Sequence, residues 1–167
     1  IELHNFDAFT ASVLQLRPQS TGEILLKSSN MRDYPAIHPN YLSDPLDQRT
    51  IVEGIRIARR ICRQSPIAEM IQSEHAPGPD YKDDDYQSLL NWARETSTTI
   101  YHPTGTCKMG QDPMAVVDEN LNVRGIKKLR VVDCSIMPQI VSGNTNGPAI
   151  MIGEKAADMI IKSKNQP

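Results

Sequence analysis

The chain has 167 residues, a formal net charge of -2 and 39% hydrophobic residues, which is typical of one large globular domain or parts of two. The balanced charge argues against nucleic-acid binding, which depends on an excess of Lys and Arg to neutralise phosphates. Apolar runs extend over only a few residues, as at 149–152, so the sequence predicts no membrane-spanning helix. The chain opens with Ile1 and not Met, and we expect it to be processed or cut from a longer polypeptide.

The first hundred residues predict strands followed by two helices. Residues 9–13 alternate in polarity, as a half-buried strand does, and residues 23–27 predict a second strand after a turn. Residues 45–63 carry an apolar stripe and predict a helix, with Ser43 or Asp44 as its cap and Pro45 in its first turn. An acidic surface loop is expected at 74–85 and a second helix at 84–96.

Three arginines of the first helix fall largely away from its apolar stripe. They are Arg56, Arg59 and Arg60. We interpret them as a solvated helix face, with a phosphate-binding patch as the alternative.

The last seventy residues predict short strands joined by loops, followed by one helix. Short strands are predicted at 116–117 and 121–123, and residues 129–132 form a β-branched run typical of a buried strand in a parallel sheet. A loop then leads into a helix predicted at 148–162, with Asn146 placed to cap it. Ligands of open α/β sheets bind beyond the carboxyl ends of strands, and a helix start offers free N–H groups. An ordinary strand–loop–helix with a structural cap is the alternative.

Few side chains of the sequence are candidates for catalysis or metal binding. His102 lies in a polar turn, where an imidazole can move protons near neutral pH, although a hydrogen-bonded structural histidine would look the same. The cysteines are odd in number and include no CxxC pair, so neither a disulfide framework nor a zinc ribbon is expected. Cys107 and His102 are a conceivable metal pair, but no second pair has ligand spacing, and we predict no metal site. Ser135 and Ser142 lack the GxSxG context of a hydrolase nucleophile.

Several motifs in combination resemble the glucose–methanol–choline (GMC) family of flavin oxidoreductases. Residues 101–110 (YHPTGTCKMG) resemble the histidine motif of that family, and the likeness continues at 115–118, 129–138, 142–146 and 150–158. Residues 15–28 and 39–42 also resemble the substrate domain of the family. The resemblance is strongest to the choline dehydrogenase and bacterial alcohol dehydrogenase branch.

The resemblance implies an FAD enzyme that oxidises the CH–OH group of an alcohol by hydride transfer to flavin N5. His102 matches the active-site histidine that takes the hydroxyl proton, and Asn146 matches the position that hydrogen-bonds the substrate oxygen. Asp133 and Cys134 match a segment that touches the pyrophosphate and ribityl parts of FAD. Asn146 and Gly147 match the backbone that approaches the pyrimidine edge of the flavin. Choline-like, sugar-like and aliphatic alcohols all remain open, as do quinone, dye and oxygen as electron acceptors.

One departure from the family is large, because no GxGxxG motif for the FAD pyrophosphate occurs in this sequence. The resemblance therefore implies the C-terminal part of an enzyme whose N-terminal FAD-binding half is its partner. The expected fold is mixed α+β: an antiparallel substrate-domain sheet with flanking helices over 1–100, then a strand–loop–helix over 101–167 that completes an FAD-binding α/β domain. A catalytically silent fragment or interaction module is the alternative, and self-association is an accompanying expectation. The location expected for the parent is cytoplasmic, with membrane association as the alternative.

Overall fold

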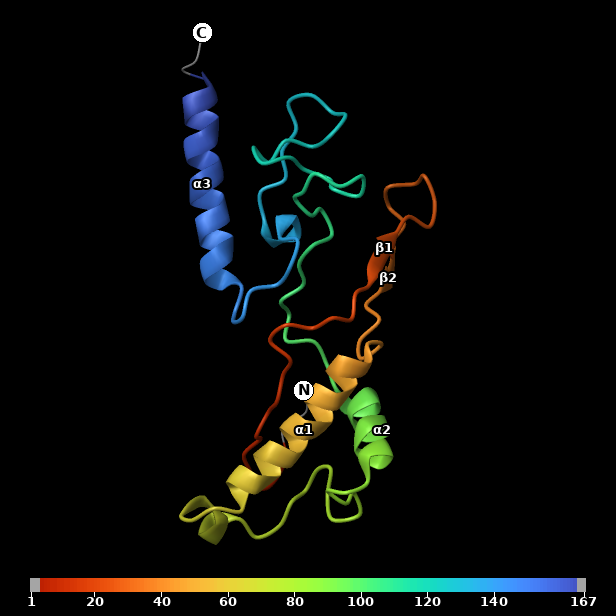
Figure 1. The fold of residues 1–167 in the computed structure, drawn as a ribbon, viewed down its shortest axis with the longest axis vertical. Helices are drawn as coiled ribbons and strands as arrows, with labels where there is room; N and C mark the ends of the chain where they lie inside the picture. The colour runs from red at the N-terminus through yellow and green to blue at the C-terminus, as the bar shows by residue number, and fades with distance from the viewer. Residues whose placement is uncertain (1–3, 165–167) are drawn as a thin grey trace. The chain divides into compact units, whose positions relative to one another are not determined.

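The structure is a computed structural model that describes residues 4–164 of the chain. The chain divides into two compact units, each assembled from two separate segments. The first unit comprises residues 4–15 and 41–97, and the second comprises residues 16–40 and 98–164. Figure 1 shows the helices α1 and α2 of the first unit, and the hairpin β1–β2 and the helix α3 of the second. Ile1, on which the expectation of a longer polypeptide rests, lies outside the described residues.

Two helices form the first unit, close to the predicted bounds. Helix α1 spans Pro45–Cys62 and helix α2 spans Tyr86–Thr96, with a short 3₁₀ helix at Ile67–Met70 between them. Asp44 caps α1 by accepting a hydrogen bond from the backbone N–H of Leu46, at 2.7 Å, and Pro45 occupies the first turn. Asp85 caps α2 in the same way through Ser88, at 3.0 Å. Both predicted helices are confirmed.

Apolar side chains from α1 and α2 form the core of the first unit. The buried members of this core are Val52, Ile55, Leu89, Leu90 and Ala93. The segment at 9–13 has no regular secondary structure and pairs with no strand, so the predicted strand is wrong. Its Val13 packs on α1 at Gly54, which shows that the alternating pattern reflected contact with a helix and not a place in a sheet.

Arg59 corrects the interpretation of the arginines of α1. Its side chain is only 7% exposed, whereas that of Arg60 is exposed. Ion pairs to Glu74 and Asp83 satisfy the guanidinium, at 2.8 and 2.7 Å. A buried charge is tolerated when it is paired in this way. The acidic loop thus covers one side of α1 and turns a helix position that looked solvated into a buried one.

The second unit contains one antiparallel hairpin. Strand β1 spans Glu23–Leu25 and pairs with β2, Ala36–His38, with Ile24 opposite Ile37. Gly22 precedes β1 at a place where a Cβ atom would overlap the carbonyl oxygen of His38, so a glycine is required there. The predicted strand at 23–27 is confirmed in its first three residues.

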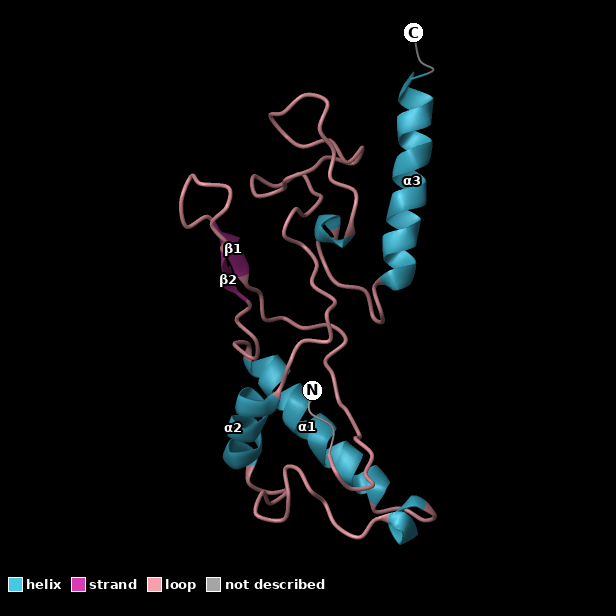
Figure 2. Cartoon of the chain, turned by 180° about the vertical axis from the view of Figure 1, so that it is seen from behind, coloured by secondary structure: helices cyan, strands magenta, loops and turns pink. Residues whose placement is uncertain are grey.

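Residues 98–137 are mostly loop, as Figure 2 shows, and are held by isolated bridges and not by strands. Val117 is fully buried and bridges both Met109 and Val123. The strand predicted at 129–132 is wrong for this chain: the segment is not helical, and Arg130 makes one antiparallel bridge with Asn122. A β-branched run favours extended backbone, but a strand also needs a hydrogen-bonded neighbour along its length.

Helix α3, Asn146–Lys164, closes the second unit. Its buried Ile152 and Ala156 pack with Val117, Ile136 and other members of a second core. Gly153, which follows Ile152, is exposed. Asn146 is the first residue of α3 and not its cap, because the carbonyl oxygen of Thr145 accepts the first intrahelical bond, from Ala149, at 2.9 Å. Across residues 4–164, no helix has both the length and the apolar character to cross a membrane.

Candidate active site

The turn that carries His102 is anchored along the segment at 133–137. The backbone N–H of Cys107 donates to the carbonyl of Ser135 at 3.0 Å, and that of Met109 donates to Ile136 at 2.8 Å. Gly105 has a φ of +85°, a conformation that favours glycine. The residues that follow His102 are therefore bonded to the segment at 133–137, and the His102 side chain is half-buried.

Thr145 connects this turn to the start of α3. Its hydroxyl oxygen lies 2.9 Å from Nδ1 of His102, across 43 positions of sequence. Thr145 immediately precedes Asn146 and Gly147, which are both exposed at the first turn of the helix. The structure thus brings His102 into contact with Thr145, the residue directly before Asn146.

Asp133 and Cys134 lie on the segment that anchors the histidine turn. Asp133 uses one carboxylate oxygen to accept from the backbone N–H of Ser135, at 2.7 Å, which caps the 3₁₀ helix Cys134–Ile136. The Sγ atom of Cys134 contacts the carbonyl oxygen of Thr145 at 3.8 Å. Cys134 therefore contacts the residue that precedes α3, and Asp133 is its neighbour in the sequence.

A further tie connects the loop before α3 to the segment that leads into β1. The Nε of Arg17 donates to the hydroxyl of Ser142 at 2.7 Å. This contact joins positions 125 residues apart and lies within the second unit.

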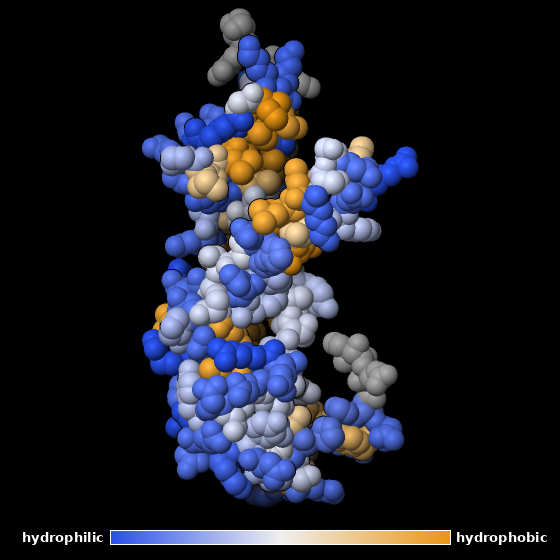
Figure 3. Space-filling view, turned by 90° about the vertical axis from the view of Figure 1, so that its right-hand side faces the viewer, coloured by the Kyte–Doolittle hydropathy of each residue, from blue (hydrophilic) through white to orange (hydrophobic). Residues whose placement is uncertain are grey.

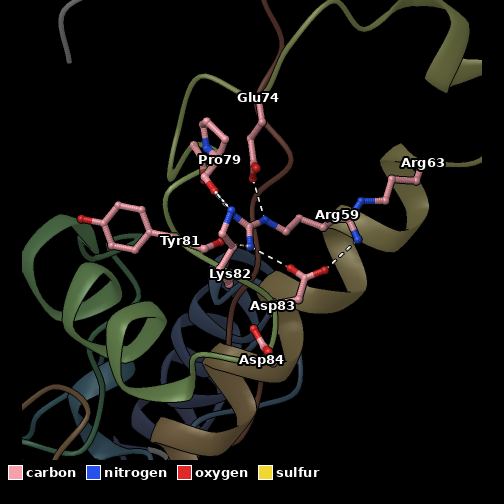
Figure 4. Close-up of a pocket in the computed structure, with 9 residues that line it drawn as sticks. Arg59, Arg63, Glu74, Pro79, Tyr81, Lys82, Asp83 and Asp84 are labelled. Atoms are coloured by element: carbon pink, nitrogen blue, oxygen red, sulfur yellow. Dashed lines mark hydrogen bonds and ion pairs between the residues drawn. The ribbon is translucent and has the colours of Figure 1, made fainter.

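A cavity of about 330 Å³ in the first unit is a rival location for a site. Figure 4 shows that the guanidinium of Arg59 occupies its centre, between Glu74 and Asp83, while Arg63 binds the other oxygen of Asp83. The hydrogen bond from Arg63, followed by that from Arg59, holds the pKa of Asp83 below its usual range. Because these charges satisfy one another, the cluster is a structural tie between α1 and the acidic loop.

The comparisons with known proteins show the family to which this chain belongs. Residues 18–153 match the family model of the GMC oxidoreductases, and the chain belongs to this family. It is 49% identical over 154 residues to an alcohol dehydrogenase [acceptor] of Pseudomonas putida, covering 92% of this chain and 28% of the relative. It is 42% identical over 168 residues to the mitochondrial choline dehydrogenase of Mus musculus, covering 96% of this chain and 28% of that relative.

Solved structures give the same assignment. A formate oxidase from Aspergillus oryzae RIB40, studied for FAD modification, superposes with a TM-score of 0.82 at 33% identity, covering 90% of this chain and 26% of that one. The family and these structures indicate FAD as the cofactor. The chain spans only about 28% of the length of these two curated relatives.

The residues at the start of α3 fit one part of FAD. A Cβ atom built at Gly147 meets no atom within 4 Å in the described part of the chain, so the backbone there is open to approach. The first N–H groups of a helix lack intrahelical acceptors and carry partial positive charge. Such donors suit the flavin edge that gains negative charge on reduction. For the pyrophosphate, this sequence has no glycine-rich loop.

Thr145 is the residue of this cluster that sequence reasoning missed. It lies inside the quoted motif at 142–146, but we assigned the helix cap to Asn146 instead. Threonine is itself a favoured cap residue, and that preference was the available signal. No periodicity or spacing rule could have paired it with a histidine 43 positions away.

Proposed function

We propose that this chain supplies the substrate-side catalytic residues of an FAD-dependent oxidoreductase acting on an alcohol. The observation that carries the proposal is the contact that places His102 next to the start of α3, within a chain that belongs to the GMC family. The relatives named for alcohol and choline support a CH–OH donor as substrate, together with a separate electron acceptor.

In this proposal His102 acts as the base. Its ring takes the hydroxyl proton of the alcohol, and the Asn146 side-chain amide donates a hydrogen bond to the same oxygen. FAD, when bound, supplies the redox chemistry by accepting a hydride at N5 from the carbinol carbon. The exposed N–H groups of Asn146 and Gly147 would hold the pyrimidine edge, and Asp133 with Cys134 would lie along the ribityl side.

The rest of the parent enzyme is the proposed partner of this chain. Large apolar side chains of the second unit are open to solvent, including Leu26 beside the hairpin, 88% exposed, and Ile150 on α3, 59% exposed. The surface view in Figure 3 shows such hydrophobic side chains among hydrophilic ones. Exposed apolar area of this kind favours association, either with an N-terminal FAD-binding half or with a second copy of the chain.

A catalytically silent fragment is the second candidate. Two observations favour it: the chain covers only 28% of the length of the Pseudomonas putida relative, and the sequence has no GxGxxG motif. The two candidates differ in the intact mass and colour of the protein purified from the cells that produce it. A longer polypeptide with visible flavin absorbance that alcohol bleaches supports the enzyme, whereas this chain recovered alone and without flavin absorbance supports the silent fragment.

The test of the base is a His102→Ala variant in the flavoenzyme that carries this chain. A positioned proton acceptor contributes about 10²–10⁴-fold, so we expect flavin reduction by alcohol to slow by that factor in stopped-flow measurements. Reoxidation by a dye should stay unchanged, because the proton and the hydride leave the alcohol in the reductive half-reaction. Asn146→Ala should be milder, about 2- to 12-fold, since it removes one neutral hydrogen bond.

The matched control is His75→Ala, a histidine of the first unit. It should reduce at the wild-type rate. A His102→Ala enzyme with normal flavin content and a normal rate of reduction would show that His102 is not the base.

A further inference from the structure

We propose that Thr145 is a positioning residue: its hydroxyl accepts a hydrogen bond from Nδ1–H of His102 and so leaves Nε2 of the ring free to take a proton. This inference rests on the proposed function, in which His102 is the base. It adds a residue to which the site had given no role.

The contact has the properties of a specific interaction. The hydroxyl oxygen and Nδ1 are 2.9 Å apart, and Thr145 is only 8% exposed. His102 is half-buried, so the bond is partly shielded from water. A hydrogen bond to this hydroxyl limits the rotation of the imidazole and selects which ring nitrogen carries the hydrogen.

The position of Thr145 explains why its hydroxyl is available to the histidine. A threonine at a helix cap ordinarily uses its oxygen to accept from the backbone N–H two or three residues on. Three residues beyond Thr145 stands Pro148, which has no N–H. The backbone of Thr145 still begins α3 by accepting from Ala149, and its carbonyl also contacts Cys134. Because residue 148 offers no N–H, the Thr145 hydroxyl makes its side-chain hydrogen bond with His102.

The direction of this hydrogen bond decides what His102 can do. A neutral imidazole has one N–H donor and one acceptor nitrogen. If Nδ1–H donates to Thr145, Nε2 carries the lone pair and can accept the alcohol proton. If the threonine hydroxyl donates instead, Nε2 carries the hydrogen and cannot act as a base. Once Nε2 is protonated, the bond from Nδ1–H to Thr145 persists, so proton uptake requires no rearrangement at this contact.

The first test is the tautomer of His102 in the wild-type flavoenzyme. We would label histidine with ¹⁵N, assign His102 by its loss in His102→Gln, and read the tautomer from long-range ¹H–¹⁵N spectra above the pKa of the ring. The expected result is protonated Nδ1 and unprotonated Nε2. An Nε2–H tautomer would overturn the proposal, and this outcome requires no variant of Thr145 to fold.

The second test compares two substitutions that differ in the hydroxyl. Thr145→Val keeps the shape and removes the oxygen, and Thr145→Ser keeps the oxygen. For Thr145→Val we expect flavin reduction to slow about 10- to 100-fold, with little change in alcohol binding, because a misaligned base loses rate. The apparent pKa in the pH profile should fall, since the imidazolium loses an acceptor. Thr145→Ser should restore both quantities.

The control is Thr98→Val. Thr98 is exposed and begins the stretch 98–164 that also contains Thr145, and its substitution should leave the rate of flavin reduction and the pH profile unchanged. If His102→Ala is inactive but Thr145→Val matches wild type in rate, pH profile and tautomer, the positioning role falls and the base survives. If His102→Ala itself is unaffected, the proposed function falls. If Thr145→Val fails to fold or to retain FAD, Thr145→Ser and the wild-type tautomer still decide.

Discussion

Arg59 is the side chain that ties the first unit together. Its Nε donates to Glu74, and its terminal nitrogens donate to Asp83 and to the carbonyl oxygens of Tyr81 and Gly78. A guanidinium is suited to this because its donors point in fixed, coplanar directions. The loop at 74–85 is thus attached to α1 at several points through one residue.

Substitution of Arg59 by Met tests this role. We expect Arg59→Met to lower the free energy of unfolding by about 1–3 kcal/mol, in the range of charge-assisted hydrogen bonds. Removing one partner of a fully buried ion pair costs more, about 3–5 kcal/mol. Here the side chains of Glu74 and Asp83 are 34% and 39% exposed, so water can solvate their carboxylates once Arg59 is removed. Urea unfolding measures the change.

Arg60→Met is the matched control, because Arg60 is the exposed neighbour on the same helix. It should change the free energy of unfolding by less than about 0.5 kcal/mol. Equal losses in the two variants would mean that the ion pairs of Arg59 do not stabilise the unit.

At the scale of elements, α3 has two roles that lie on different parts of the helix. Its first turn carries Asn146 and Gly147, which are exposed beside the His102 contact. Its middle carries Ile152 and Ala156, which are buried in the core of the second unit. Packing of the middle therefore holds the first turn in register with the histidine turn.

Truncation of Ile152 tests the packing role of α3. Ile152 is 5% exposed, and Ile152→Ala should cost about 2–5 kcal/mol of stability, through lost burial and the cavity left behind. In the 167-residue chain, Ile150→Ala removes the same atoms from a position of the same helix that is 59% exposed, and it should cost far less. Thermal or urea melts of the two variants measure the difference. Similar melting of both would place Ile152 outside the core.

At the scale of the whole molecule, the proposed flavin site is incomplete within this chain, and many large apolar side chains of the described residues are exposed. We propose that backbone N–H groups at the start of α3 bind one edge of the flavin, and the sequence has no glycine-rich phosphate loop. Its exposed apolar side chains are those expected of a piece that packs against further protein. The boundary between substrate and FAD domains near residue 100 stays a prediction.

Equilibrium dialysis of the 167-residue chain with FAD tests this view. We expect no submicromolar binding, because the pyrophosphate contributes much of the recognition in dinucleotide sites and its cradle is missing here. The full-length flavoenzyme, dialysed in parallel, should retain its flavin. Tight binding by the 167-residue chain would mean that residues outside the expected set hold the cofactor.

Local patterns in the sequence were sufficient for the helices and for the family. Pro45, an acidic cap and an apolar stripe define α1 whatever lies around it, and the histidine motif with its companions defines the GMC likeness. These signals are short-range, since capping and amphipathic periodicity act within a few residues. The roles expected for His102 and Asn146 came from the family resemblance of their motifs and stay predictions.

Only the tertiary structure decided which distant residues meet. The burial of Arg59 depends on a loop 15 to 24 positions further along, and the bond between Thr145 and His102 spans 43 positions. The run at 129–132 indicated extended backbone, but pairing into a strand depends on a neighbour that the run itself does not encode. Contacts of this kind come from chain packing, so the composition and periodicity of either partner alone leave them undetermined.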